Sequence, residues 1–340
     1  MTTAAPASRE GAGASGPTAR PRWLWARRIG TWAFFALVAW LLVKQARGID
    51  WDDVMAAFSR LPASTLLTAA ALAAASFTLY STYDLLGRYL TGHPLGTRTV
   101  MGVTFISYAF NLNLGSLVGG VAFRYRLYSR LGLGNAVITR VLGFSMLTNW
   151  FGYLVVAGAA FCFWPLDLPP DWKIDSGGLR VLGGVLLALG AGYLVLCATA
   201  KEKTLSLRGH ELQVPTLRMA LLQLVMSCTN WSLMGGVVWL LLQQKVAYPE
   251  VLAVLLVGAV AGVITHVPAG LGVLEAVFVA LLSHKLPQGQ ILAGLIGYRA
   301  LYYLAPLAIA TIAYVAMEVR ARRASRASGQ IAAPKPPKRY

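Results

Sequence analysis

Residues 250–283 read EVLAVLLVGAVAGVITHVPAGLGVLEAVFVALLS, a long apolar stretch that is interrupted once, at THVPAGLG (265–272). About 20 apolar residues cross a bilayer, so this stretch is too long for a single span. Proline and closely spaced glycines interrupt helices. Free backbone N–H and C=O groups cannot face lipid, so the break must lie against protein or a watery cavity. The pattern predicts a helical hairpin.

A second interrupted stretch lies near residues 100–121, with its break at NLNLGS (111–116). Arginines follow it with no acidic residue between them, namely Arg124, Arg126, Arg130 and Arg140. Such a cluster belongs on the cytoplasmic side under the positive-inside rule. The preceding segment already places Arg88 and Arg98 on that side. A hairpin that returns to the side it entered from therefore fits better than a full span.

The composition agrees with a membrane protein. The 340 residues are 57% hydrophobic and only 13% charged, against roughly 25% charged residues in soluble domains. The three cysteines lie far apart in apolar runs, which excludes a disulfide scaffold and a standard zinc site. We predict an all-α polytopic membrane bundle with two Gly/Pro-broken re-entrant hairpins in an inverted repeat. Full spans are expected near 29–43, 64–82, 137–164, 179–199, 216–242 and 289–317. Eight ordinary spans are the alternative.

The charge distribution divides the chain into three parts. More than half of the net charge of +17 lies in residues 1–28 and 318–340. We expect disordered basic tails at 1–28 and 319–340 and a transmembrane domain at 29–318. Basic tails beside apolar spans indicate that both termini are cytoplasmic in a bacterial inner membrane. Because the tails lack a nucleic-acid-binding fold, nucleic acid is not an expected partner.

The two breaks share a pattern: a Gly-rich interruption, an apolar step and then a charge. They read GSLVGGVAFR (115–124) and PAGLGVLE (268–275). Interrupted segments in corresponding positions of two halves point to a transport site. The N-terminus of a returning half-helix also attracts anions such as phosphate. The hinge candidates are Gly115, Gly119, Gly120, Pro268, Gly270 and Gly272. Helix packing through small-xxx-small pairs is the alternative role for such glycines.

Polar side chains near the breaks are the candidate substrate-binding residues. Ionisable groups in apolar segments are costly unless paired, so they are functional candidates. The set is Arg124, Arg126, Glu275, Arg299, Tyr125, Asn111 and His266. A structural ion pair of Glu275 with Arg299 or Arg124 fits as well as substrate contact. For Asp84, an interfacial position or a local pair is favoured, and for His266 a structural hydrogen bond. The tyrosines near the arginines favour an aromatic belt at the interface, namely Tyr125, Tyr128, Tyr298, Tyr302 and Tyr303.

Enzymatic signatures are missing from the sequence. It contains no HExxH, GxSxG or Walker motif. We therefore predict no catalytic residue, no cofactor and no metal. Without an ATP-binding motif, any transport would be downhill or coupled to an ion gradient.

Four segments carry a family resemblance: SYAFN (107–111), GGVAFRYRLYS (119–129), HVPAGLGVLEA (266–276) and YRALYYLAP (298–306). With them the chain resembles the transmembrane region of lysylphosphatidylglycerol synthases over roughly residues 25–318. PAG replaces the more frequent PGG of that family. In full-length members this region is the flippase half, and a separate cytosolic domain makes the aminoacylated lipid. The resemblance implies that Arg124, Arg126, Glu275 and Arg299 lie near a lipid path. It does not extend to the synthase domain.

Three functional hypotheses follow. The first is a flippase-like translocase for anionic or aminoacylated phosphatidylglycerol-type lipids, with membrane phospholipids as partners. The second is a non-transporting membrane subunit that docks a separate lipid-modifying enzyme. The third is a membrane enzyme that uses Asp84, His266 and Glu275 as acid–base groups. The motifs favour the first.

Overall fold

The computed structural model describes residues 61–164, 175–200, 204–207, 210–265 and 267–331, besides a few isolated positions. The predicted span near 29–43, the N-terminal tail and His266 lie outside the described residues. The chain divides into two units, residues 1–48 and residues 49–340, and the description below concerns the described residues of the second.

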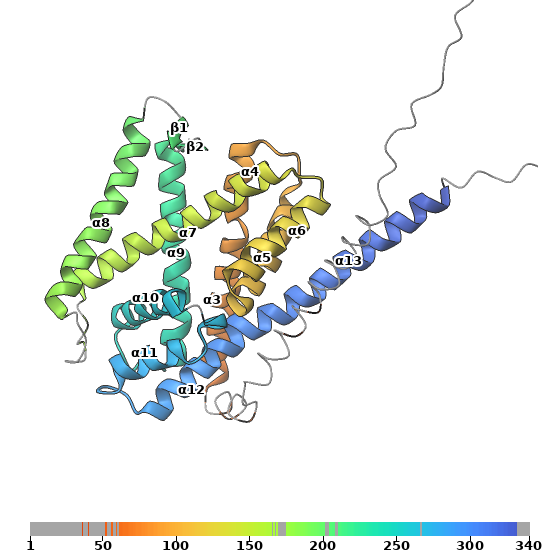
Figure 1. Ribbon diagram of the computed structural model, residues 1–340. Helices are drawn as coiled ribbons and strands as arrows, with labels where there is room; N and C mark the ends of the chain where they lie inside the picture. Colours follow the sequence, from red (N-terminus) through yellow and green to blue (C-terminus); the bar gives the residue numbers. More distant parts are fainter. Residues whose placement is uncertain are drawn as a thin grey trace, which may run out of the picture. The chain divides into compact units, whose positions relative to one another are not determined.

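The described chain is built almost entirely of helices (Figure 1). This confirms the predicted all-α class. The helices are α3 (Ala63–Ser81), α4 (Tyr83–Thr91), α5 (Thr97–Leu114), α6 (Phe123–Arg130), α7 (Asn135–Phe163), α8 (Ser176–Thr199), α9 (Leu217–Leu241), α10 (Tyr248–Thr265), α11 (Val273–Leu282), α12 (Gln288–Tyr298) and α13 (Ala305–Ile331). One short antiparallel hairpin, β1 (Thr204–Leu207) and β2 (His210–Gln213), was not expected from the sequence.

Six helices of the described part are long and apolar enough to cross a membrane. They are Ala63–Thr91, Asn135–Phe163, Ser176–Thr199, Leu217–Leu241, Tyr248–Thr265 and Gln288–Val319. All but Tyr248–Thr265 correspond to predicted full spans, and that helix is the first arm of the second predicted hairpin. Many outward side chains are large and apolar, including Val225 and Ile312, as expected for helices that face lipid.

The first break forms a tight helical turn. Helix α5 ends at Leu114, and Gly115 adopts φ 83°, a conformation that glycine enters without a Cβ penalty. The chain returns through a π-helical segment, Ser116–Ala122, and continues into α6. The returning arm packs closely on α5, because a Cβ at Gly119 would collide with the backbone of Phe110. Here the glycines therefore supply both a turn and close packing.

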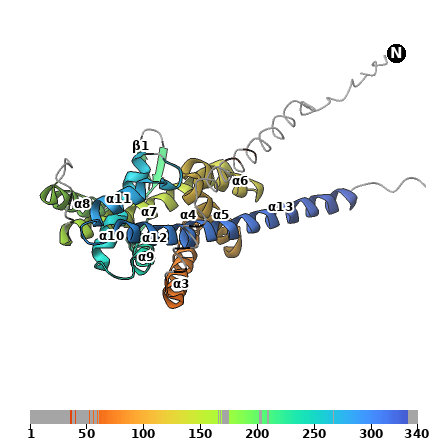
Figure 2. The same cartoon turned by 90° about the horizontal axis from the view of Figure 1, so that it is seen from below.

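The second break joins α10 to α11 through one short 3₁₀ turn, Pro268–Gly270. Ala269, Gly270 and Gly272 all have positive φ, at 57°, 56° and 76°. The two helices pack side by side, again as the arms of a hairpin (Figure 1). Helices α12 and α13 are joined by a second π-helical segment, Arg299–Leu304, and run on as one long helix (Figure 2). Helix α13 reaches Ile331, beyond residue 319, where the composition predicts a disordered tail.

Candidate functional site

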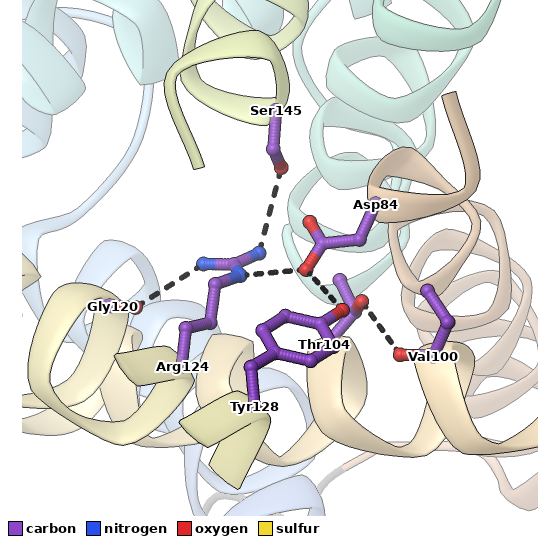
Figure 3. Close-up of polar contacts among 7 residues, drawn as sticks. All are labelled: Asp84, Val100, Thr104, Gly120, Arg124, Tyr128 and Ser145. Atoms are coloured by element: carbon purple, nitrogen blue, oxygen red, sulfur yellow. Dashed lines mark hydrogen bonds and ion pairs between the residues drawn. The ribbon is translucent and has the colours of Figure 1, made fainter. Parts of the chain in front are cut away.

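A buried ion pair anchors the first hairpin (Figure 3). The Arg124 Nε atom donates to Asp84 Oδ2 at 3.0 Å, and the two side chains are only 3% and 0% exposed. Tyr128 donates its hydroxyl to the same carboxylate oxygen at 2.9 Å. Burying charges is costly unless they are paired and hydrogen-bonded. The arrangement therefore meets the main condition for keeping both charges inside the helix bundle.

Arg124 also holds the returning arm of the hairpin. Its Nη1 atom donates to the carbonyl of Gly120 at 3.4 Å, and Nη2 lies 3.5 Å from Ser145 Oγ on α7. One guanidinium thus joins α4, the π-helical segment and α7. Asp84 is paired, but neither locally nor at an interface as suggested from the sequence. Its partner lies 40 residues away in the sequence, which sequence reasoning did not identify.

Buried polar atoms without a hydrogen-bond partner occur in this pair and in a histidine near it. Within the described part of the chain, Asp84 Oδ1 and both ring nitrogens of His93 are buried and make no hydrogen bond. The imidazole of His93 lies 6.2 Å from the ring of Tyr128. Burial, together with the charge of Arg88, lowers the pKa of His93 below its ordinary value. The fold therefore favours the neutral imidazole.

We expect this histidine to make the protein less stable in acid. A histidine whose folded-state pKa is lowered contributes full stability above its unfolded pKa of about 6.5, and that contribution is lost as the pH falls from this value through the lower folded-state pKa. The thermal unfolding midpoint of the detergent-purified protein should fall between about pH 7.5 and about pH 5. His93→Gln should reduce that fall. An unchanged pH profile in His93→Gln would contradict the assignment.

A second ion pair lies at the second hairpin. Arg299 donates two hydrogen bonds to Glu275, from Nε to Oε1 at 2.5 Å and from Nη2 to Oε2 at 2.9 Å. The same guanidinium donates to the carbonyls of Ala269 and Gly270, each at 3.0 Å. These carbonyls lie in the turn between α10 and α11, where the helical hydrogen-bond ladder is interrupted. Arg299 supplies the donors that such backbone groups need inside a membrane protein.

The two ion pairs share one design. In each, an arginine binds a carboxylate from another helix; Arg299 also binds two carbonyls of the turn at its break, whereas Arg124 contacts the carbonyl of Gly120, four residues earlier in its own arm. The structural pairing suggested for Glu275 and Arg299 is therefore present. Both guanidinium groups are occupied in this conformation, so an incoming phosphate would have to displace a carboxylate.

Stacked tyrosines connect the two pairs. Tyr80 lies beside Arg124 and stacks on Tyr108, with ring centroids 3.5 Å apart. The hydroxyls of Tyr108 and Tyr302 are 3.2 Å apart, and Tyr302 stacks on Tyr298 at 5.2 Å. Tyr298 directly precedes Arg299. We call Tyr80, Tyr108, Tyr302 and Tyr298 the tyrosine ladder.

The ladder is supported by polar contacts with a serine of α3 and an asparagine of one further helix, α9. Ser76 Oγ lies 2.6 Å from the hydroxyl of Tyr302 and donates to Asn230 Oδ1 at 2.7 Å. The aromatic-belt interpretation is wrong for Tyr128, Tyr298 and Tyr302, because all three side chains are fully buried. Sequence reasoning missed the ladder because apolar context does not distinguish an interfacial tyrosine from an interior one.

The other predicted residues occupy separate positions. Arg126 Nε donates to the hydroxyl of Tyr314 on α13 at 2.9 Å. The Tyr125 hydroxyl lies 2.5 Å from Thr139 Oγ1 on α7. The half-buried side chain of Asn111 faces Gly120 across the first hairpin. Neither His266 nor the side chain of Pro268 is among the described parts.

The two described carboxylates that were suggested for acid–base chemistry are both engaged in ion pairs, Asp84 with Arg124 and Glu275 with Arg299. Among the residues that the structure describes, no group of three His, Cys, Asp or Glu side chains is arranged to hold a metal ion.

The fold and the paired charges define a polytopic helical membrane protein with two broken hairpins, each beside an arginine–carboxylate pair that is buried at the first break and partly buried at the second. The model of the family "Lysylphosphatidylglycerol synthase TM region" matches residues 29–310, and the chain belongs to that family.

Curated relatives agree with this assignment. The chain is 47% identical over 304 residues to "Inner membrane protein YbhN" of Escherichia coli K12, covering 89% of this chain and 96% of that protein. It is 31% identical to "Uncharacterized protein slr0712" of Synechocystis, covering 81% of this chain and 86% of the relative. It is 23% identical to "Phosphatidylglycerol lysyltransferase" of Staphylococcus aureus MRSA252, covering 82% of this chain but only 32% of that protein.

Proposed function

We propose that the protein translocates phospholipids with anionic or aminoacylated phosphatidylglycerol-type headgroups between membrane leaflets. The observation that carries the proposal is the pair of helix breaks, each with an arginine–carboxylate pair beside it, and at the second break the arginine also binds two carbonyls of the turn. Broken helices with buried charge are typical of transport sites in membrane proteins. The similarity to part of a phosphatidylglycerol lysyltransferase supports this lipid class.

The chemistry of the headgroup suggests how such a lipid would replace the partners in the two ion pairs. A phosphate can replace a carboxylate on a guanidinium, because both anions accept two parallel N–H bonds. An ammonium group on an aminoacylated headgroup could then pair with the released carboxylate. A lipid carrying both groups would substitute for both partners of an ion pair. The cost of leaving one charge buried and unpaired would then be avoided.

The same proposal includes the topology. Both hairpins would be re-entrant, and both termini would be cytoplasmic, as the basic flanks indicate. The headgroup would pass between the two ion pairs along the tyrosine ladder, while the acyl chains stay in the bilayer.

Leaflet exchange of fluorescent phosphatidylglycerol in proteoliposomes tests the proposal. We expect the wild type to exchange lipid faster than empty liposomes. Glu275→Gln should return exchange to the empty-liposome rate, because it removes the carboxylate that positions Arg299 at the second break and that would pair with a cationic headgroup. Glu250→Gln is the matched control, since Glu250, in the first turn of α10, pairs with the exposed Lys285 just beyond the end of α11, away from the break. Its exchange rate should equal that of the wild type.

A non-transporting membrane subunit that docks a lipid-modifying enzyme is the second candidate. It is favoured by the lysyltransferase match, in which this region accounts for only about a third of the relative. A folded wild type that exchanges anionic, zwitterionic and aminoacylated lipids no faster than empty liposomes would support it over translocation. Glu275→Gln should then leave binding to the partner enzyme intact.

A further inference from the structure

An apolar groove runs between α3, α5 and the start of α13. Its volume is about 570 Å³, within the roughly 300–1,000 Å³ of typical small-ligand sites. Aromatic and small side chains form its walls, including Phe77, Gly102, Phe105, Pro306 and Ile309. Neither ion pair lines it, so it is distinct from the two clamped hairpins.

The groove offers no free hydrogen-bonding group to an occupant. Among the described residues that line it, the hydroxyl groups belong to Thr78 and Ser81. Thr78 donates to the carbonyl of Ala74 at 2.8 Å, and Ser81 donates to that of Phe77 at 2.6 Å. Both hydroxyls are therefore satisfied within α3. The part of an occupant that enters the groove should be pure hydrocarbon, because a polar atom there would lose its hydration without compensation.

An exposed cation lies next to the groove on the same face of α5. Arg98 precedes Met101 and Gly102, both lining residues, by three and four positions, and residues at these spacings share one helix face. The rise along a helix places its Cα about 5–6 Å beyond theirs. Arg98 forms no ion pair with any residue that the structure describes. It also lies at the helix end that the sequence assigns to the cytoplasmic side.

We infer that this groove binds one acyl chain of a phospholipid whose phosphate pairs with Arg98. A hydrocarbon slot beside an unpaired cation at one helix end matches a lipid tail joined to a phosphate. The first turn of α5 has no side-chain cap, so its backbone N–H groups are also available to the phosphate.

A protein occupant would fit this arrangement less well. The apolar segment 29–43 of the same chain contains no acidic residue. Seated in the groove, it would leave Arg98 without a counter-charge, whereas a phospholipid supplies one.

The ring of Phe77 would separate the bound lipid from the buried tyrosines. Phe77 lies on the groove wall, and its ring centroid is 5.0 Å from that of Tyr108 and 5.1 Å from that of Tyr302. The groove therefore adjoins the tyrosine ladder. The inference goes beyond the proposed function, because a lipid can bind here whether or not it is moved across the membrane.

Photo-crosslinking of the full-length protein in nanodiscs tests the site. The probes are phosphatidylglycerol with a diazirine on one acyl chain and diacylglycerol with the same chain. In the wild type, both should label peptides of α3, α5 and α13. Gly102→Leu should reduce this labelling several-fold, because nothing lies within 4 Å of a Cβ at Gly102 and the leucine can project into the groove and obstruct it. Gly143→Leu, at an exposed glycine of α7 with equal space, should leave it unchanged.

The Arg98→Gln variant distinguishes the contribution of the phosphate to binding from that of the acyl chain. We expect labelling by phosphatidylglycerol to fall about fivefold, as for the loss of one basic side chain near an anionic lipid. Labelling by diacylglycerol should not change.

Three results would overturn the inference. Labelling could be spread over all lipid-facing helices and remain insensitive to Gly102→Leu. Arg98→Gln could affect both probes equally. The groove could stay unlabelled while Gly102→Leu lowers the unfolding temperature, which would show that segment 29–43 or a second copy fills it. Cross-linking measures lipid binding in the groove, whereas leaflet exchange measures transport. A negative result for the groove can therefore be distinguished from a negative result for the proposed function.

Discussion

Arg124→Met is expected to destabilise the protein by about 3–5 kcal/mol, the usual cost of removing one partner of a buried ion pair. The carboxylate of Asp84 would remain completely buried with only the hydroxyl of Tyr128 as a donor. The arm that carries Arg124 would also lose its guanidinium contacts with α4 and α7, so it should loosen. Unfolding by heat in detergent, followed by tryptophan fluorescence, measures the loss.

The double variant Asp84→Asn/Arg124→Met separates stability from function. It removes both charges and leaves an amide oxygen that can accept from Tyr128, so most of the lost stability should return. If the pair belongs to the lipid path, lipid exchange should nevertheless remain at the empty-liposome rate. Arg130→Met is the control, because Arg130 forms a more exposed pair with Glu318, and surface pairs contribute about 0–1 kcal/mol. A double variant as unstable as the single one would show that the charges themselves are required for folding.

Arg299→Lys is expected to open the second break although it keeps the positive charge. The guanidinium fork reaches both oxygens of Glu275 and the carbonyls of Ala269 and Gly270 at once. A lysine ammonium is a point donor on a flexible stem and cannot reproduce this geometry. Each lost hydrogen bond to a charged group is worth about 1.5–3 kcal/mol. Amide hydrogen exchange across the α10–α11 turn should therefore become at least about tenfold faster.

Lys285→Arg is the matched control for this prediction. Lys285 also pairs with a glutamate, Glu250, but the lysine side chain is 41% exposed. Changing one cation for the other there should leave exchange in the turn unaltered, because solvent supplies alternative partners. Equal exchange in Arg299→Lys and the wild type would contradict the clamp and indicate that the glycines alone maintain the turn.

Local sequence predicted the features that depend on local chemistry. Hydropathy predicted the membrane class and five of the six long apolar helices of the described chain. The glycines at Gly115, Gly270 and Gly272 predicted the breaks, and each adopts a positive φ there. These predictions succeeded because backbone conformation at glycine and transfer into lipid are properties of a residue and its near neighbours.

Partner choice was predicted only in part. Glu275 with Arg299 was one of two pairings that the sequence allowed for this glutamate, whereas the Asp84–Arg124 pair was not proposed. The partners come from different helices, and which arginine reaches which carboxylate depends on how those helices pack. Periodicity within one segment carries no information about that packing.

Composition and hydropathy by themselves determined that this protein is a helical membrane bundle with two interrupted segments, because lipid forces every backbone group into a local hydrogen bond unless the chain supplies another partner. Tertiary structure alone decided that Tyr80, Tyr108, Tyr302 and Tyr298 stack in the interior and connect the two ion pairs. A tyrosine suits a membrane interface or a buried contact equally well by its own chemistry. Only the arrangement of α3, α5 and the segment around Arg299 supplies the rings and hydroxyls that make the buried position the stable one.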